Sequence, residues 1–239
     1  MTTVAKKKAR VRIDLDSPEH FINRKLSLLE FNRRVLAQAK VKSTPLLERL
    51  FFLCIASSNI DEFFEIRVAG LKQQVAFGSV QSGPDNMSPS EQLRKIRAVA
   101  HEIVEEQYSV LNEHILPGLK KEGIHCLDRN HWNQTQQKWI KSYFNRELLP
   151  ILSPVGLDPA HPFPQVLNKS LNFIISLEGK DAFGRNSGIA IVQAPRALQR
   201  LVQLPQSCSN HAYDFVFLSS IIHNHAGDLF PGMKVTGCY

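Results

Sequence analysis

Hydrophobic residues recur at intervals of three and four along the first half of the chain, which is the period of an amphipathic helix. This pattern predicts a first helix over residues 28–42, where Ser27 and Glu30 have the spacing of a capping box. A second helix is predicted from Pro45 to about Ala56, because proline suits a first helical position. That segment is apolar on nearly every side, as expected for a helix buried inside a bundle.

The stretch "ASSNIDEFFEIRVAGL" (residues 56–71) interrupts this apolar run with Ser57, Ser58 and Asn59. We predict that a third helix opens at Asn59, since Asp61 and Glu62 would then lie at the positive end of the helix dipole. Two roles for Asn59 remain open from the residues alone. Its side-chain oxygen could cap the helix, or its carboxamide, which both donates and accepts, could bind the edge of a purine base.

A fourth and longer helix is predicted after the loop "GSVQSGPDNMSPS". Ser88, Pro89 and Glu91 form its capping box, and Gly123 after "KKE" is the expected residue at its C-terminal end. Four helices with short connections predict an antiparallel helical bundle, which we assign to a domain over residues 21–122.

The pattern changes after Gly123, where short apolar runs alternate with turn residues. We predict a helix over residues 133–152, another helix within 214–230, and strands at 124–128, 170–179, 188–195 and 234–239. The chain is therefore expected to be an α+β multidomain protein, with an α+β domain over residues 123–239. The final strand stops without a turn signal, so we expect this domain to be incomplete at its C-terminus.

Charge and hydropathy narrow the classes of partner. The net charge of +7 owes much to Lys6, Lys7, Lys8, Arg10 and Arg12 in a basic segment, residues 1–20, that we expect to be disordered. Net charge therefore gives no reason to expect a nucleic-acid partner. The longest apolar run, residues 50–56, is too short to cross a membrane. We expect a cytoplasmic protein without a transmembrane segment, and peripheral association with a membrane stays open.

Candidate catalytic groups are scarce. The four cysteines are far apart and lack zinc spacing, and the common phosphate-binding, hydrolase and dinucleotide motifs are absent. Nine histidines include His161 in "DPAHPFP" and the pair His223 and His225, none with an acid or metal partner at local spacing. We therefore predict no catalytic residue and no metal ligand in this chain.

Three segments carry a family resemblance: "LSLLEFNRRVLAQA", "TPLLERLFFLCIASSNIDEFFEIRVAGL" and "LDPAHPFP". Together they resemble the N-terminal part of long-chain polyphosphate kinase. The resemblance implies an N-terminal domain and part of the head domain of an enzyme that reversibly transfers the terminal phosphate of ATP to polyphosphate through a phosphohistidine. It also implies that the catalytic histidines and the Mg²⁺ ligands of the full-length enzyme lie outside this chain, which alone would be inactive.

The same resemblance implies one ATP contact here, Asn59, the asparagine before "DEF". It would approach the base of the nucleotide, and this favours the ligand role of Asn59 over the cap. The implied partners are ATP or ADP, polyphosphate, and further copies of the chain in a dimer or tetramer. The alternative is a non-catalytic assembly module that binds no nucleotide.

Overall fold

The computed structural model describes residues 14–79, 82–157, 162–180 and 188–239. The chain divides into two compact units, Met1–Gly118 and Leu119–Tyr239. The basic residues 6–12 and His161 lie outside the described residues. Residues 14–20 are described, and they include a short 3₁₀ turn, η1, at Pro18–His20. None of the described helices is both long and apolar enough to span a membrane.

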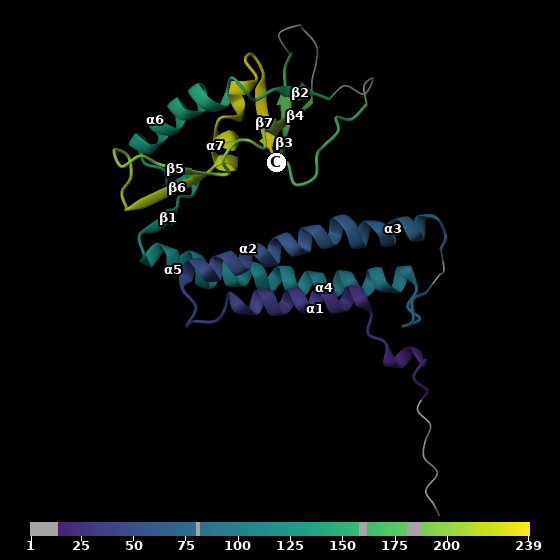
Figure 1. Cartoon of the computed structure of the whole chain (residues 1–239). Helices are drawn as coiled ribbons and strands as arrows, with labels where there is room; N and C mark the ends of the chain where they lie inside the picture. Colours follow the sequence, from purple (N-terminus) through teal and green to yellow (C-terminus); the bar gives the residue numbers. More distant parts are fainter. Residues whose placement is uncertain (1–13, 80–81, 158–161, 181–187) are drawn as a thin grey trace, which may run out of the picture. The chain divides into compact units, whose positions relative to one another are not determined.

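The first unit is a bundle of helices that lie side by side (Figure 1). Helix α1 packs against both α2 and α4, and α3 also packs against α4. Large aliphatic side chains from each of these helices are fully or almost fully buried, among them Leu29, Leu36, Leu53, Leu71, Ile96 and Ile103. The bundle is built from α1 (Arg24–Gln38), α2 (Leu46–Glu62), α3 (Ala69–Ala76) and α4 (Pro89–Ser109), with π-helical stretches η2 (Phe63–Val68) and η3 (Val110–Ile115). Helix α5 (Leu116–Lys121) begins in this unit and ends in the next.

The predicted helix start at Asn59 is wrong. Asn59 lies inside α2, which runs on through η2 into α3 without a break. One buried stripe explains this, because Leu53, Ala56, Ile60 and Phe63 recur at helical spacing across the polar residues and are all buried. Packing of that stripe overrides the modest helix propensity of serine and asparagine.

The start of the first helix also differs from the prediction. Helix α1 begins at Arg24, and Oδ1 of Asn23 accepts from the backbone amides of Lys25 at 3.0 Å and Leu26 at 3.1 Å. Ser27 therefore lies within the helix rather than at its cap. The start of α4 is confirmed, since Ser88 Oγ accepts from the amide of Glu91 at 3.2 Å.

The second unit combines helices with two small sheets (Figure 1), which confirms the α+β class. One sheet has the strand order β1-β6-β5, with β1 parallel to β6, and the other has the order β2-β4-β3-β7 and is antiparallel. The strands are β1 (Ile124–Cys126), β2 (Pro154–Gly156), β3 (Leu171–Glu178), β4 (Ile189–Ala194), β5 (Leu201–Gln203), β6 (Tyr213–Phe217) and β7 (Lys234–Cys238).

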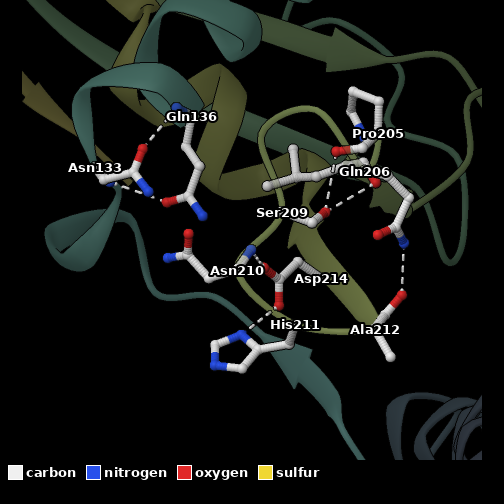
Figure 2. Close-up of polar contacts among 10 residues, drawn as sticks. Asn133, Gln136, Pro205, Gln206, Ser209, Asn210, His211, Ala212 and Asp214 are labelled. Carbon is white, nitrogen blue, oxygen red and sulfur yellow. Dashed lines mark hydrogen bonds and ion pairs between the residues drawn. The ribbon is translucent and has the colours of Figure 1, made fainter.

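The helices of this unit share a hydrophobic core with the strands. Helix α6 (Gln134–Tyr143) continues into the π-helical stretch η5 (Phe144–Leu148), and α7 (Leu218–Asn224) follows β6. A full capping box starts α6, because Asn133 and Gln136 each accept from the other's backbone amide at 2.9 Å (Figure 2). The helix predicted within 214–230 is confirmed as α7, whereas β6, β2 and β5 were not predicted. Short 3₁₀ turns at η4 (Arg129–His131) and η6 (Ala226–Leu229) complete the unit.

Candidate nucleotide site

Asn59 faces α1, where its side chain meets a buried asparagine. Its Nδ2 donates to Oδ1 of Asn32 over 3.1 Å, and Asn32 Nδ2 donates to the backbone oxygen of Ala56 over 3.0 Å. Asn32 is only 3% exposed, whereas Asn59 is half-buried. The three groups form a short relay from the backbone of α2 through α1 and back to α2.

This relay determines which way the Asn59 amide points. A backbone oxygen can only accept, so Asn32 must direct its NH₂ group toward Ala56 and its oxygen toward Asn59. Asn59 must then direct its own NH₂ group toward Asn32. Within the part of the chain that the structure describes, Oδ1 of Asn59 accepts no hydrogen bond, so this oxygen is available to a ligand.

A hollow of about 160 Å³ adjoins this amide. It is smaller than the ~300–1,000 Å³ of pockets that enclose a whole ligand, so its size suits part of one, such as a flat ring. Most of the wall is apolar or aromatic. Phe63 is buried, whereas the side chains of Phe31 and Ile66 are exposed. The wall is formed by Leu28, Leu29, Phe31, Asn32, Asn59, Ile60, Glu62, Phe63, Ile66 and Arg67.

The charged residues at the hollow are one acid and one base. Glu62 ends α2, and Arg67 lies in the π-helical stretch η2, so both follow Asn59 on the same continuous helix. Their formal charges cancel, and binding here would depend on apolar contact and on the oriented amide rather than on net charge. A π-helical turn is often found at functional sites, but η3 and η5 show that it is not specific to this one.

His223 and His225, the pair noted in the sequence, have structural partners in the second unit. His225 lies 3.2 Å from Asp228 and close to the ring of Phe144, and His223 contacts the guanidinium of Arg129. Burial lowers the pKa of His225, and the neighbouring Lys141 lowers it further. These contacts give no nucleophile and base in a shared cavity, so the structure does not assign a catalytic role to either histidine.

Asn32 is the site residue that sequence reasoning missed. It was placed in the first helix, but nothing in the local pattern connected it to Asn59, which is 27 residues away. One signal was available: an asparagine in "LEFNRR" shares the helical face of the buried Leu29 and Leu36, at spacings of three and four. A buried amide in such a stripe requires a polar partner from another helix.

Comparison with known proteins also divides the chain into an N-terminal and a C-terminal part. The model of the polyphosphate kinase N-terminal domain matches residues 21–127, and the model of the polyphosphate kinase middle domain matches residues 135–239. The polyphosphate kinase of Pseudomonas aeruginosa is 54% identical over 225 residues, which are 94% of this chain and 33% of that protein. That of Neisseria meningitidis serogroup C is 56% identical over 216 residues, 90% of this chain and 32% of that protein.

A solved structure is also similar. The crystal structure of polyphosphate kinase from Porphyromonas gingivalis matches with a TM-score of 0.72 and 28% sequence identity, over 90% of this chain and 32% of that one. The chain thus spans about a third of the length of the curated relatives that it matches. Because the two domain models follow one another along nearly all of residues 21–239, this chain belongs to the polyphosphate kinase family.

Proposed function

We propose that this chain is the N-terminal part of a polyphosphate kinase and that it provides a contact to the base of ATP at Asn59. The complete protein would transfer the terminal phosphate of ATP to polyphosphate, reversibly and through a phosphohistidine, using groups outside this chain. The observation that carries the contribution of this chain is the Asn59 amide, held by Asn32 beside a hollow of ring size.

The chemistry of adenine fits the orientation of that amide. The exocyclic amino group of adenine is a hydrogen-bond donor, and Oδ1 of Asn59 is an acceptor with no partner among the described residues. Guanine has an acceptor at the corresponding position, which would face the same oxygen unfavourably. The apolar wall of the hollow would cover a face of the ring.

The residues around the hollow do not suit magnesium. Mg²⁺ prefers octahedral oxygen coordination through carboxylates, phosphates and water, and Glu62 is the one carboxylate that lines the hollow among the described residues. The Mg²⁺ ligands of the complete enzyme would therefore come from other parts of the protein. This chain alone would make no polyphosphate.

The alternative, a module for assembly, is favoured by exposed apolar side chains on the helical bundle. Leu47 and Phe51 on α2 are each 61% exposed, and Phe31 and Ile66 at the hollow are about half exposed. Apolar residues gathered on a surface are typical of contacts between proteins. A second copy of the chain could cover them without any nucleotide.

Titration with ATP and sedimentation separate these two functions. We expect the purified chain of residues 1–239 to bind ATP weakly and saturably, to bind GTP more weakly, and to lose ATP binding in Asn59→Ala. Asn112→Ala is a matched control, because Asn112 is an exposed asparagine in the same unit. Self-association that ignores nucleotide, with no ATP binding at millimolar concentration, would favour the assembly module instead.

A further inference from the structure

A cluster of possible metal ligands lies in the second unit, apart from the Asn59 hollow. His125 is in β1, Asp214 is in β6, and His211 precedes β6 by two residues. The parallel pairing of β1 with β6 places His125 directly opposite Asp214. One ligand atom from each of the three residues lies within 4.8 Å of the other two.

The carboxylate of Asp214 is held in place and fully buried. Its Oδ1 is 2.9 Å from Nδ1 of His211, and its Oδ2 accepts from the backbone amide of Asn210 at 2.8 Å (Figure 2). Asp214 has no exposed surface, and a buried carboxylate needs a cation or several donors near it. Asn210 therefore orients one oxygen of Asp214 while the other faces the histidines.

The two imidazoles are also close together. The rings of His125 and His211 stack with their centroids 3.5 Å apart and their planes at 9°. Each ring therefore offers a nitrogen close to the Asp214 carboxylate, and it is the neutral form of imidazole that binds metals. Two imidazoles and a carboxylate are a ligand set for zinc, whereas Mg²⁺ and Ca²⁺ prefer oxygen alone.

We propose that His125, His211 and Asp214 bind a zinc-type divalent transition metal ion. The backbone amide of Asn210 would keep its hydrogen bond to the other carboxylate oxygen, Oδ2 of Asp214. Binding through Nδ1 requires the His211 tautomer with its proton on Nε2, so the contact between Nδ1 and Oδ1 of Asp214 would be replaced by a bond from each atom to the ion. Three protein ligands leave a fourth tetrahedral position for water or another donor.

Binding of zinc requires small movements of the two imidazole rings. Tetrahedral zinc with bonds of about 2.0–2.1 Å separates its ligand atoms by roughly 3.3 Å. Nδ1 of His211 and Oδ1 of Asp214 are 2.9 Å apart and must separate slightly, and the ligand atoms of all three residues already lie within 4.8 Å of one another. The parallel rings must also tilt open, because an imidazole lone pair lies in the plane of its ring. His211 can do so readily, since its side chain is 41% exposed.

The test uses the chain of residues 1–239, metal-free and without an affinity tag. Zinc is titrated in against a chromophoric chelator, and Co²⁺ replaces zinc to report the coordination geometry from its visible absorption. We expect one equivalent of zinc to bind and the Co²⁺ complex to have the intense bands of a four-coordinate site. Zinc should also raise the unfolding temperature, because it binds the folded state.

Variants identify the ligands. His125→Ala and His211→Ala should each bind zinc at least about tenfold more weakly, and Asp214→Asn should lose a similar factor or more. His131→Ala is the control in the same unit, since the His131 side chain is 81% exposed and lies outside the cluster, and it should bind as the unchanged chain does. Circular dichroism shows which variants are folded, and His125→Ala leaves the buried Asp214 and its two hydrogen bonds in place.

The proposal is overturned if the unchanged chain binds no zinc at tens of micromolar. It is equally overturned if folded His125→Ala and His211→Ala keep the full affinity and the same rise in unfolding temperature. Neither result would affect the proposed nucleotide contact, because Asn59 lies in the other unit and is tested with a different ligand.

Discussion

At the scale of single residues, the pair Asn32 and Asn59 carries the proposed nucleotide contact. The sequence indicated Asn59 as either a cap or a ligand, and the structure removes the cap because Asn59 lies inside a helix. Asn32 could not be predicted as its partner, since the hydrogen bond joins two helices. A contact of this kind follows from tertiary packing and has no local spacing.

Asn32→Asp tests the relay directly. A carboxylate at this buried position cannot donate to the backbone oxygen of Ala56, and it would place two acceptors against each other. We expect a loss of about 1–3 kcal/mol in the free energy of unfolding, measured with urea. Asn112→Asp, at an exposed asparagine of the same unit, should change the stability little. Equal effects of the two substitutions would contradict the relay.

The lowered pKa of His225 leads us to expect that the stability of the fold depends on pH. Its folded pKa is below the ordinary value of 6.5 because of burial and Lys141, while Asp228 acts in the opposite direction. The unfolded chain then binds more protons than the folded chain below that value, so stability falls as the pH decreases from about 7 to 5. His225→Gln removes this titration and should make the fall shallower in urea unfolding at several pH values.

The control for this pH series is His101→Gln, because the His101 side chain is 76% exposed on α4. It should keep the pH dependence of the unchanged chain. His125 also has a lowered pKa, so part of the dependence should remain in His225→Gln. A pH profile that His225→Gln leaves unaltered would show that the folded environment of His225 does not disfavour its charge.

At the scale of elements, the continuity of α2, η2 and α3 is the main departure from the sequence prediction. Ser57, Ser58 and Asn59 are frequent at helix caps, and local propensity alone therefore favoured a start there. The buried stripe of Leu53, Ala56, Ile60 and Phe63 crosses these residues without a phase shift, which is the signal that outweighs them. The cap of α4 was predicted correctly, because the capping residues Ser88, Pro89 and Glu91 stand directly before the apolar stripe of that helix and both signals therefore indicate the same start.

Ser58→Pro tests this continuity. Inside a helix, proline removes a backbone hydrogen bond and clashes with the preceding turn, so we expect a loss of about 3 kcal/mol or more in urea unfolding. Ser58 is exposed, so the loss of its hydroxyl contributes little. Ser58→Ala is the matched control and should stabilise by up to about 0.5 kcal/mol. A helix that began at Asn59 would instead tolerate proline at position 58.

At the scale of the whole molecule, the α+β class and the change of character after Gly123 were predictable from periodicity and turn residues. Gly123 has a φ of +76°, which explains why glycine stands at this helix end. The strands β2 and β5 were missed: β2 contains Pro154 and Gly156, two residue types that are rare in strands, and β5 has only three residues. The helix within 214–230 was predicted, but β6 was missed because it passes directly into α7 without a turn residue.

The cluster of His125, His211 and Asp214 also could not be predicted from local sequence. Sequence analysis predicted no metal ligand, since these residues lack the close spacing of familiar zinc motifs. Strand pairing brings His125 opposite Asp214 across a long stretch of sequence. Sites that depend on sheet register become visible only when the topology is known.

The most direct measurement of the central claim is the steady-state kinetics of a polyphosphate kinase that carries this chain as its N-terminal part, with Asn59→Ala. Loss of one hydrogen bond to the base should raise the KM for ATP about three- to tenfold, leave kcat and the KM for polyphosphate nearly unchanged, and narrow the preference for ATP over GTP. Asn112→Ala should match the unchanged enzyme in all three. An unaltered KM for ATP and unaltered base preference in folded Asn59→Ala would contradict the nucleotide contact.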